Sequence, residues 1–148
     1  MRELPRQLSE DELAELFEGE TRLVERLAQR ADPLGPVAEQ IAAGLSSDEK
    51  LEAVNAHPPI GARRGSLSAR SAAEQGADAD PQVLAELARL NAEYEARHGF
   101  RFVVFVDRRP KTEILAVLRS RIDRPTDEEL DTALAELVAI ARDRWQRG

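Results

Sequence analysis

Three short segments of the sequence carry the pattern that begins an α-helix, and they constrain the fold more than any other feature. Each places a hydroxyl residue three positions before a glutamate: Ser9-Glu10-Asp11-Glu12, Ser46-Ser47-Asp48-Glu49 and Thr126-Asp127-Glu128-Glu129. In such a capping box the hydroxyl accepts from a free backbone N–H, and the glutamate accepts from the N–H of the capping residue. Asp80-Pro81 predicts a fourth start, because an N-cap acceptor there precedes a proline at the first helical position.

Apolar residues follow these starts at the spacing of a helix face, and Pro36 and Pro110 suit two further starts. The pattern predicts an all-α fold: a single-domain bundle of about seven or eight helices over residues 1–148, joined by short connections. The predicted stripes are Leu13, Leu16 and Phe17; Leu23, Val24 and Leu27; Leu51 and Val54; Leu84, Leu87, Leu90 and Tyr94; Ile114, Leu115 and Leu118; and Leu130, Leu134, Leu137, Val138 and Ala141.

One segment departs from the helical pattern. It reads Phe102-Val103-Val104-Phe105-Val106, and its β-branched and aromatic residues favour an extended chain. No second segment of comparable quality is available to pair with it. It is either a buried connector between helices or a place where unpaired backbone N–H and C=O groups bond a flat polar ligand.

Charge and composition exclude several classes of function. The chain has 148 residues, of which 33% are charged, and a formal net charge of -7, so a nucleic-acid partner, which needs a basic face, is not expected. The absence of cysteine excludes disulfides, thiolate metal sites and a cysteine nucleophile. No apolar run approaches the roughly 20 residues that span a bilayer, and the N-terminus lacks the apolar core of a signal peptide. We therefore expect no membrane partner and a cytoplasmic location.

The two histidines are the scarcest titratable side chains. His57 precedes a proline, so the helix that begins near Ser47 must end beside it, where the macrodipole favours a protonated imidazole. His57 is either a general acid near neutral pH or a residue that caps its own helix. His98 adjoins Gly99, which suits a helix end, and we expect it to be another cap or a surface residue. Because the two lie far apart in sequence, no metal site is predicted.

A polar cluster follows at Ser68-Ala69-Arg70-Ser71-Ala72-Ala73-Glu74-Gln75. On a short helix begun by Ser66 or Ser68, the side chains of Ser71, Glu74 and Gln75 point the same way. A hydroxyl, a carboxylate and a carboxamide together suit a ureido or imide group, whose edge alternates donors and acceptors. The alternative is a solvated polar face.

These pieces, in this order, resemble the OHCU decarboxylase family, whose members convert 2-oxo-4-hydroxy-4-carboxy-5-ureidoimidazoline (OHCU) to (S)-allantoin in urate degradation. The resemblance runs from about residue 50 to 145. Where the family typically reads Phe-Gly-Phe-Pro-Phe, this chain has His98 and Arg101 at two of the five positions. The matching pieces are Ala56-His57-Pro58 with Ile60-Gly61, Leu67 to Gln75, Leu90-Asn91-Ala92-Glu93-Tyr94, Gly99-Phe100 with Phe102, Glu113-Ile114-Leu115 with Arg121-Ile122, Glu129, Ala133-Leu134, and Ile140-Ala141 with Arg144.

The resemblance implies a role for particular residues. His57 corresponds to the catalytic histidine and Glu74 to its partner carboxylate. The extended segment corresponds to a piece that meets the ligand through backbone groups. An arginine is expected to bind the substrate carboxylate, with Arg144 as first candidate and Arg121 as second. The implied substrate-binding residues are Pro58, Ser71, Gln75, Phe102, Val103, Val104, Phe105, Val106, Arg144 and Arg121.

The implied substrate determines which cofactors are needed. Its carboxylate lies on a carbon next to a ring C=N bond, which accepts the electrons released with carbon dioxide, so we expect neither a metal nor an organic cofactor. The resemblance also implies a homodimer. Two alternatives stay open: a helical interaction module without chemistry, and a cofactor-free lyase or hydrolase that acts on a related ureide, which the departures at His98 and Arg101 keep open.

Overall fold

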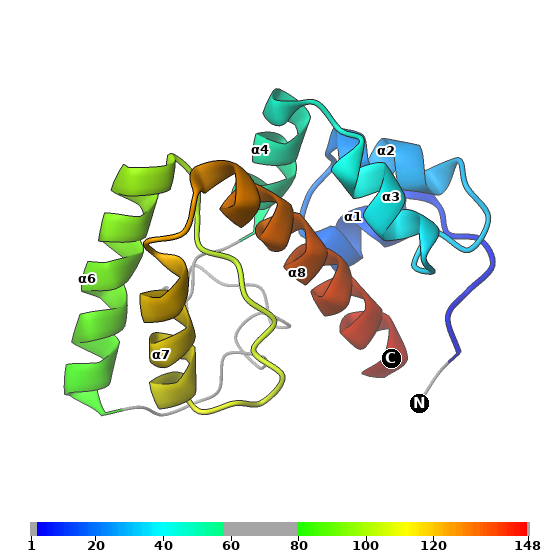
Figure 1. Ribbon diagram of the computed structural model, residues 1–148. Helices are drawn as coiled ribbons and strands as arrows, with labels where there is room; N and C mark the ends of the chain where they lie inside the picture. The colour runs from blue at the N-terminus through cyan, green and yellow to red at the C-terminus, as the bar shows by residue number, and fades with distance from the viewer. Residues whose placement is uncertain (1–2, 58–79, 148) are drawn as a thin grey trace. The chain divides into compact units, whose positions relative to one another are not determined.

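The structure is a computed structural model that describes residues 3–57 and 80–147 (Figure 1). The described residues contain no β-strand, and the predicted all-α fold is confirmed. None of the helices within them has the length and apolar composition needed to cross a bilayer. The seven helices in this part of the chain are α1 (Glu10–Phe17), α2 (Arg22–Ala28), α3 (Val37–Ala43), α4 (Ser47–Ala56), α6 (Pro81–His98), α7 (Lys111–Arg121) and α8 (Thr126–Arg147).

Two of the three predicted capping boxes are formed. Ser9 Oγ accepts from the backbone N–H of Glu12 at 3.1 Å, and the Glu12 carboxylate accepts from the N–H of Ser9 at 3.0 Å. Ser46 and Glu49 make the same pair of bonds at the start of α4, at 3.2 and 2.9 Å. The bond from the Ser46 backbone holds the pKa of the Glu49 carboxyl below its ordinary value. Asp80 also caps its helix as predicted, by accepting from Gln82 N–H at 2.7 Å.

The third predicted capping box, at Thr126, is wrong. Thr126 is the first residue of α8, and the N–H of Glu129 donates to the carbonyl of Pro125 at 3.0 Å. The Glu129 carboxylate does not return to the helix start, because three side chains from elsewhere in the fold donate to it. Tertiary partners have replaced the local bond that the spacing predicted.

The described residues divide into two compact units. One, which we call the terminal unit, consists of residues 3–57 and 130–147. The other, the central unit, consists of residues 80–129. The division falls inside α8, whose first turn belongs to the central unit and whose remainder belongs to the terminal unit.

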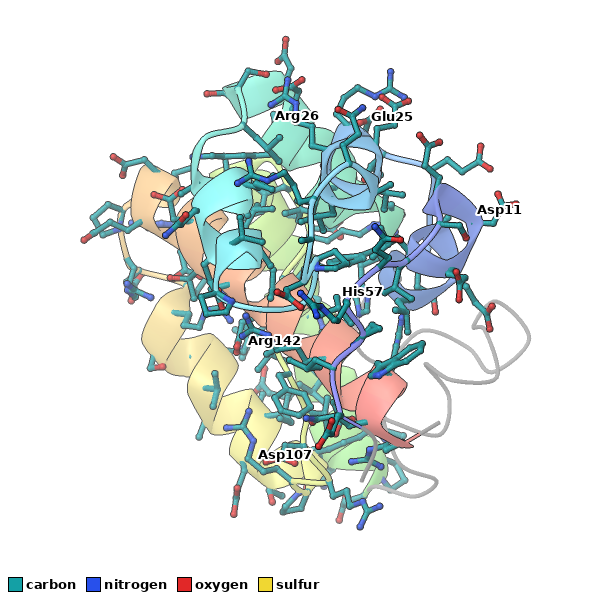
Figure 2. The ribbon with its side chains drawn as sticks, turned by 90° about the vertical axis from the view of Figure 1, so that its right-hand side faces the viewer. Asp11, Glu25, Arg26, His57, Asp107 and Arg142 are labelled. Carbon is teal, nitrogen blue, oxygen red and sulfur yellow. The ribbon has the colours of Figure 1, made fainter. Side chains whose placement is uncertain are left out.

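In the terminal unit, α2 packs against α1, α3 and α4. Its apolar face is formed by Leu23, Val24 and Leu27, all fully buried, which is the stripe expected from the sequence. On its other side, Arg26 forms an ion pair with Glu49 of α4 at 2.7 Å (Figure 2). The α2 helix therefore contacts the rest of the terminal unit through apolar packing on one face and through an ion pair on the other.

Arg142 fastens α8 to the residues around the start of α3. Its guanidinium donates to the carbonyl oxygens of Leu34 and Gly35, at 2.5 and 2.8 Å, and forms a two-pronged ion pair with Glu39 at 2.6 and 2.9 Å (Figure 2). The hydrogen bond with Arg142 lowers the pKa of the Glu39 carboxyl. One arginine thus ties the last helix to a loop more than 100 residues earlier in the chain.

In the central unit, α6 and α7 lie side by side (Figure 1). Gly99 ends α6 in the left-handed region, at φ 78°, and its N–H donates to the Glu95 carbonyl at 2.8 Å. The chain then runs from the end of α6 to the start of α7 without a helical turn, through residues 102–106 (Figure 1). Tyr94 packs edge-on against Phe100 and Phe102, with ring centroids 5.8 and 5.3 Å apart.

Candidate active site

His57 lies where the sequence predicted, at the end of α4. Its backbone N–H donates to the Val54 carbonyl at 3.2 Å, and its own backbone is extended, at φ -81° and ψ 136°. The residue is 6% exposed, so its imidazole is buried (His57 is labelled in Figure 2). The helix that carries it is fixed at its other end by the Ser46 capping box. Residues Pro58, Ser71, Glu74 and Gln75, predicted to complete the site, lie outside the described residues.

Arg144, the first candidate for the substrate carboxylate, is buried in the terminal unit. Its side chain is 1% exposed. Its Nη1 donates to the Leu16 carbonyl at 2.8 Å and lies 3.2 Å from the carboxylate of Glu18. These contacts place a positive charge at the C-terminal end of α1, where unpaired carbonyls and the helix dipole favour a cation. Glu18 itself ends α1 with a left-handed backbone, at φ 64°.

Arg121, the second candidate, is buried in the central unit. Its Nε donates to Glu129 at 2.8 Å and its Nη1 to the Val103 carbonyl at 2.7 Å. The guanidinium carbon lies 4.6 Å from the centre of the Phe102 ring, so the cation lies over the aromatic face. Its Nη2 has no hydrogen-bond partner among the described residues.

Glu129 is the acceptor at the centre of this cluster. Its carboxylate is fully buried and accepts from Tyr94 Oη at 2.6 Å, from Arg121 and, at 2.8 Å, from Arg124. Burial, followed by the hydrogen bond to Glu129, raises the pKa of the Tyr94 hydroxyl well above its ordinary value. Sequence reasoning assigned Glu129 to a helix cap and missed this role. In the sequence, Glu129 simply fits the helical spacing of α8. Nothing in its local context indicates that its carboxylate is buried.

The extended segment is largely buried. Phe102, Val103, Val104 and Val106 are each 6% exposed or less, while Phe105 is intermediate. The side chain of Arg121 donates to the carbonyl of Val103, and that of Arg109 donates to the carbonyls of Phe105 and Val106. The backbone of Val104 makes no hydrogen bond in the part of the chain that the structure describes. The structure therefore brings Arg121 and the segment together, as two of the predicted site elements.

His98 is not the surface residue or helix cap that the sequence suggested. It is 6% exposed, and its two ring nitrogens lie 2.7 Å from Thr126 Oγ1 and 2.9 Å from the Ile122 carbonyl. Its ring also packs on Tyr94, with centroids 4.5 Å apart. His98 is buried because this last residue of α6 faces the connection between α7 and α8, which offers both hydrogen-bond partners. The described residues contain no group of three or more His, Cys, Asp or Glu that could hold a metal ion.

Comparison with known proteins decides the family. The model of the OHCU decarboxylase family matches residues 2–146. This chain belongs to the OHCU decarboxylase family. The resemblance predicted from the His-Pro step, the Ser-x-x-Glu-Gln cluster and the Leu-Asn-x-x-Tyr helix is confirmed, and so is the prediction of a carboxy-lyase.

Individual relatives agree with the family match. The 2-oxo-4-hydroxy-4-carboxy-5-ureidoimidazoline decarboxylase of Haloferax volcanii is 30% identical over 140 residues, which cover 88% of this chain and 83% of that protein. The uric acid degradation bifunctional protein PucL of Bacillus subtilis is 27% identical over 144 residues, 90% of this chain and 29% of PucL. A crystal structure of OHCU decarboxylase in the presence of (S)-allantoin superposes with a TM-score of 0.73 over 90% of this chain and 94% of that one, at 23% identity. That structure shares the fold.

Proposed function

We propose that this chain removes the carboxylate of OHCU as carbon dioxide and yields (S)-allantoin in urate degradation. The observation that carries the proposal is the position of His57: a buried imidazole at the end of α4, in a chain whose match to the family extends over residues 2–146. A histidine held between a helix end and the proline that follows it in sequence has little freedom, and a general acid–base must be held in one geometry.

The chemistry that the protein must supply is limited. When carbon dioxide leaves, the electron pair of the broken carbon–carbon bond flows into the adjacent ring C=N, and a proton then completes the product. Because the substrate accepts these electrons itself, the proposed reaction proceeds without a metal or an organic cofactor. The protein holds the ring, stabilises the developing negative charge and delivers the proton to one face, which makes the product a single enantiomer.

His57 and Glu74 are assigned to proton transfer. His57 handles the protons of the substrate hydroxyl and ring as a general acid–base, and Glu74 orients its imidazole. Such a group typically contributes about 10²- to 10⁴-fold in rate. Pro58 lines the pocket, while Ser71, Gln75 and the backbone of residues 102–106 hold the ureido arm. The Val104 backbone, which makes no hydrogen bond within the described residues, supports this role for the segment.

Arg144 remains the first candidate for the substrate carboxylate. Arg121 stays the second candidate: its Nε and Nη1 donate to Glu129 and Val103 within the central unit, and its Nη2 has no partner among the described residues. An arginine offers a carboxylate two parallel N–H donors, which a lysine cannot reproduce. Arg144→Lys should therefore weaken the binding of OHCU, which carries the carboxylate, more than that of (S)-allantoin, which has lost it.

The decisive experiment generates the unstable substrate in solution from urate and follows the optical activity of the allantoin formed. We expect the wild-type protein to give (S)-allantoin faster than the spontaneous reaction, which gives a racemate. A racemic product at the spontaneous rate would contradict the proposed function. A cytoplasmic location and a homodimer complete the proposal, and the homodimer is supported by the family resemblance. Light scattering coupled to size-exclusion chromatography tests the dimer.

A further inference from the structure

The turn that follows the extended segment is strained. Asp107 and Arg108 both have left-handed backbones, with φ of 48° and 60°, which residues other than glycine rarely adopt (Asp107 is labelled in Figure 2). Two such residues in succession persist only where the surrounding contacts hold them in place. Here those contacts come from the next residue, Arg109.

Arg109 closes the turn with three hydrogen bonds. Its backbone N–H donates to the Val106 carbonyl at 3.0 Å, and its Nε donates to the same oxygen at 3.1 Å. Its Nη2 donates to the Phe105 carbonyl at 2.5 Å. A planar guanidinium holds these side-chain donors in a fixed arrangement. One partly exposed side chain therefore fixes the end of the segment to the turn that follows it.

Arg121 acts on the same edge of the segment. In an extended chain the N–H and C=O groups of alternate residues point to one edge, so Val103 and Phe105 share an edge. Arg121 takes the Val103 carbonyl at 2.7 Å, and Arg109 takes that of Phe105. Val104 belongs to the opposite edge, and its backbone makes no hydrogen bond in the described residues. The two arginines thus hold the carbonyls of Val103 and Phe105 on one edge and that of Val106 on the other, and they leave the backbone of Val104 for something else.

We propose that Arg109 is a positioning residue for the reaction: it fixes the extended segment so that the backbone of Val104 meets the substrate. This inference rests on the proposed function, in which that segment holds the ureido arm. Arg109 acts through the carbonyls of Phe105 and Val106 and not by contact with the reacting atoms. The segment binds the ureido arm equally in the ground state and the transition state, so disorder there raises KM more than it lowers kcat.

The test compares Arg109→Ala with Arg108→Ala. Arg108 is the adjacent residue, lies in the same turn and is exposed, and its side chain makes no hydrogen bond or ion pair within the described residues. Each variant removes one positive charge, but only Arg109→Ala removes the bonds to the segment. We expect Arg109→Ala to raise KM by about tenfold or more, the effect of losing charge-assisted hydrogen bonds, with a smaller change in kcat. The affinity for (S)-allantoin, measured by calorimetry, should fall by a similar factor.

A second readout follows the order of the segment itself. Amide hydrogen exchange of residues 102–106, measured by mass spectrometry, should be faster in Arg109→Ala than in the wild type and unchanged in Arg108→Ala. Unchanged KM in Arg109→Ala, or an equal rise in Arg108→Ala, would overturn the proposal, even if exchange were faster. If the wild type makes no optically active allantoin, the proposed function fails, and exchange alone decides whether Arg109 orders the segment. Should Arg109→Ala not fold, Arg109→Lys undergoes the same measurements, with a smaller effect in the same direction expected.

Discussion

At the scale of single residues, the two histidines show how similar sequence contexts lead to different roles. Both lie at the end of a helix, and both are 6% exposed. His98 is bonded through both ring nitrogens to the connection between α7 and α8, and it stacks on Tyr94. It therefore fills the place of the phenylalanine that the family typically has there, by keeping the aromatic packing and adding two polar contacts. His57 closes α4 through its backbone, and its imidazole is assigned to catalysis.

Replacement of His57 should affect catalysis and not folding. His57→Asn keeps the backbone bond to Val54 and removes the only proposed proton donor, so we expect (S)-allantoin formation to fall by at least about 10²-fold. The rate of optically active product, with circular dichroism as the check of folding, measures this. His98→Asn is the control: it should lower stability by about 1–3 kcal/mol, because two hydrogen bonds of a buried side chain are disturbed, while the folded protein keeps its activity. Wild-type turnover in His57→Asn would remove His57 from the mechanism.

The buried Glu129 should be the most costly carboxylate to replace. Glu129→Gln leaves the buried Arg121 without a counter-charge, and breaking a buried ion pair in this way costs about 3–5 kcal/mol. We expect a lower midpoint of urea unfolding at an unchanged slope. The exposed neighbour Glu128 provides the control, because Glu128→Gln should change stability by less than about 0.5 kcal/mol. Equal stability of the two variants would contradict the account of the cluster.

At the scale of elements, local patterns predicted helix starts well when the partners were close in sequence. The boxes at Ser9 and Ser46 and the cap at Asp80 formed because every donor and acceptor lies within three residues. The box at Thr126 failed because Tyr94, 35 residues away, and two arginines compete for Glu129. The hydrogen-bond partners of the extended segment could not be predicted from the sequence either. Residue propensity predicted an extended chain, but it did not predict that arginine side chains donate to three of its carbonyls.

The capping box of α4 provides a test at this scale. Ser46→Ala removes the acceptor for the Glu49 N–H, and such a change typically costs about 1 kcal/mol. Ser47→Ala alters the adjacent exposed hydroxyl inside the helix and should be neutral or slightly stabilising, since alanine is the better helix former. Thermal unfolding of both variants beside the wild type measures the difference. Equal melting temperatures would mean that the box contributes nothing to α4.

The link between α3 and α8 should depend on pH. The hydrogen bond with Arg142 lowers the Glu39 pKa from 4.5, so its stabilising contribution is complete above about that value and disappears as pH falls through the lower folded-state pKa. Glu39→Gln should therefore cost at most about 1 kcal/mol at pH 7, because the pair is partly exposed to screening solvent. The cost should shrink toward zero in acid. Urea unfolding of both proteins at a series of pH values measures it; a difference independent of pH would contradict this assignment.

At the scale of the whole molecule, the two compact units place the predicted site residues in separate groups. His57 and Arg144 belong to the terminal unit, and Arg121 and the extended segment belong to the central unit. The helical periodicity predicted the helices of each unit, because each stripe is a local pattern. It did not predict the division within α8, because Glu129 and Leu130 continue one uninterrupted helix and nothing in their spacing marks a boundary.

Tyr94 and Trp145 are the only tyrosine and the only tryptophan in the chain, and they fall one in each unit. Tyr94 donates to Glu129 in the central unit, and the indole N–H of Trp145 donates to the Glu3 carbonyl in the terminal unit, at 2.7 Å. The unlabelled protein therefore carries two intrinsic spectroscopic probes, one in each unit, and each reports on the structure around it. Tryptophan fluorescence follows the melting of one region and tyrosine near-ultraviolet absorbance that of the other. Coincident curves identify a single cooperative transition.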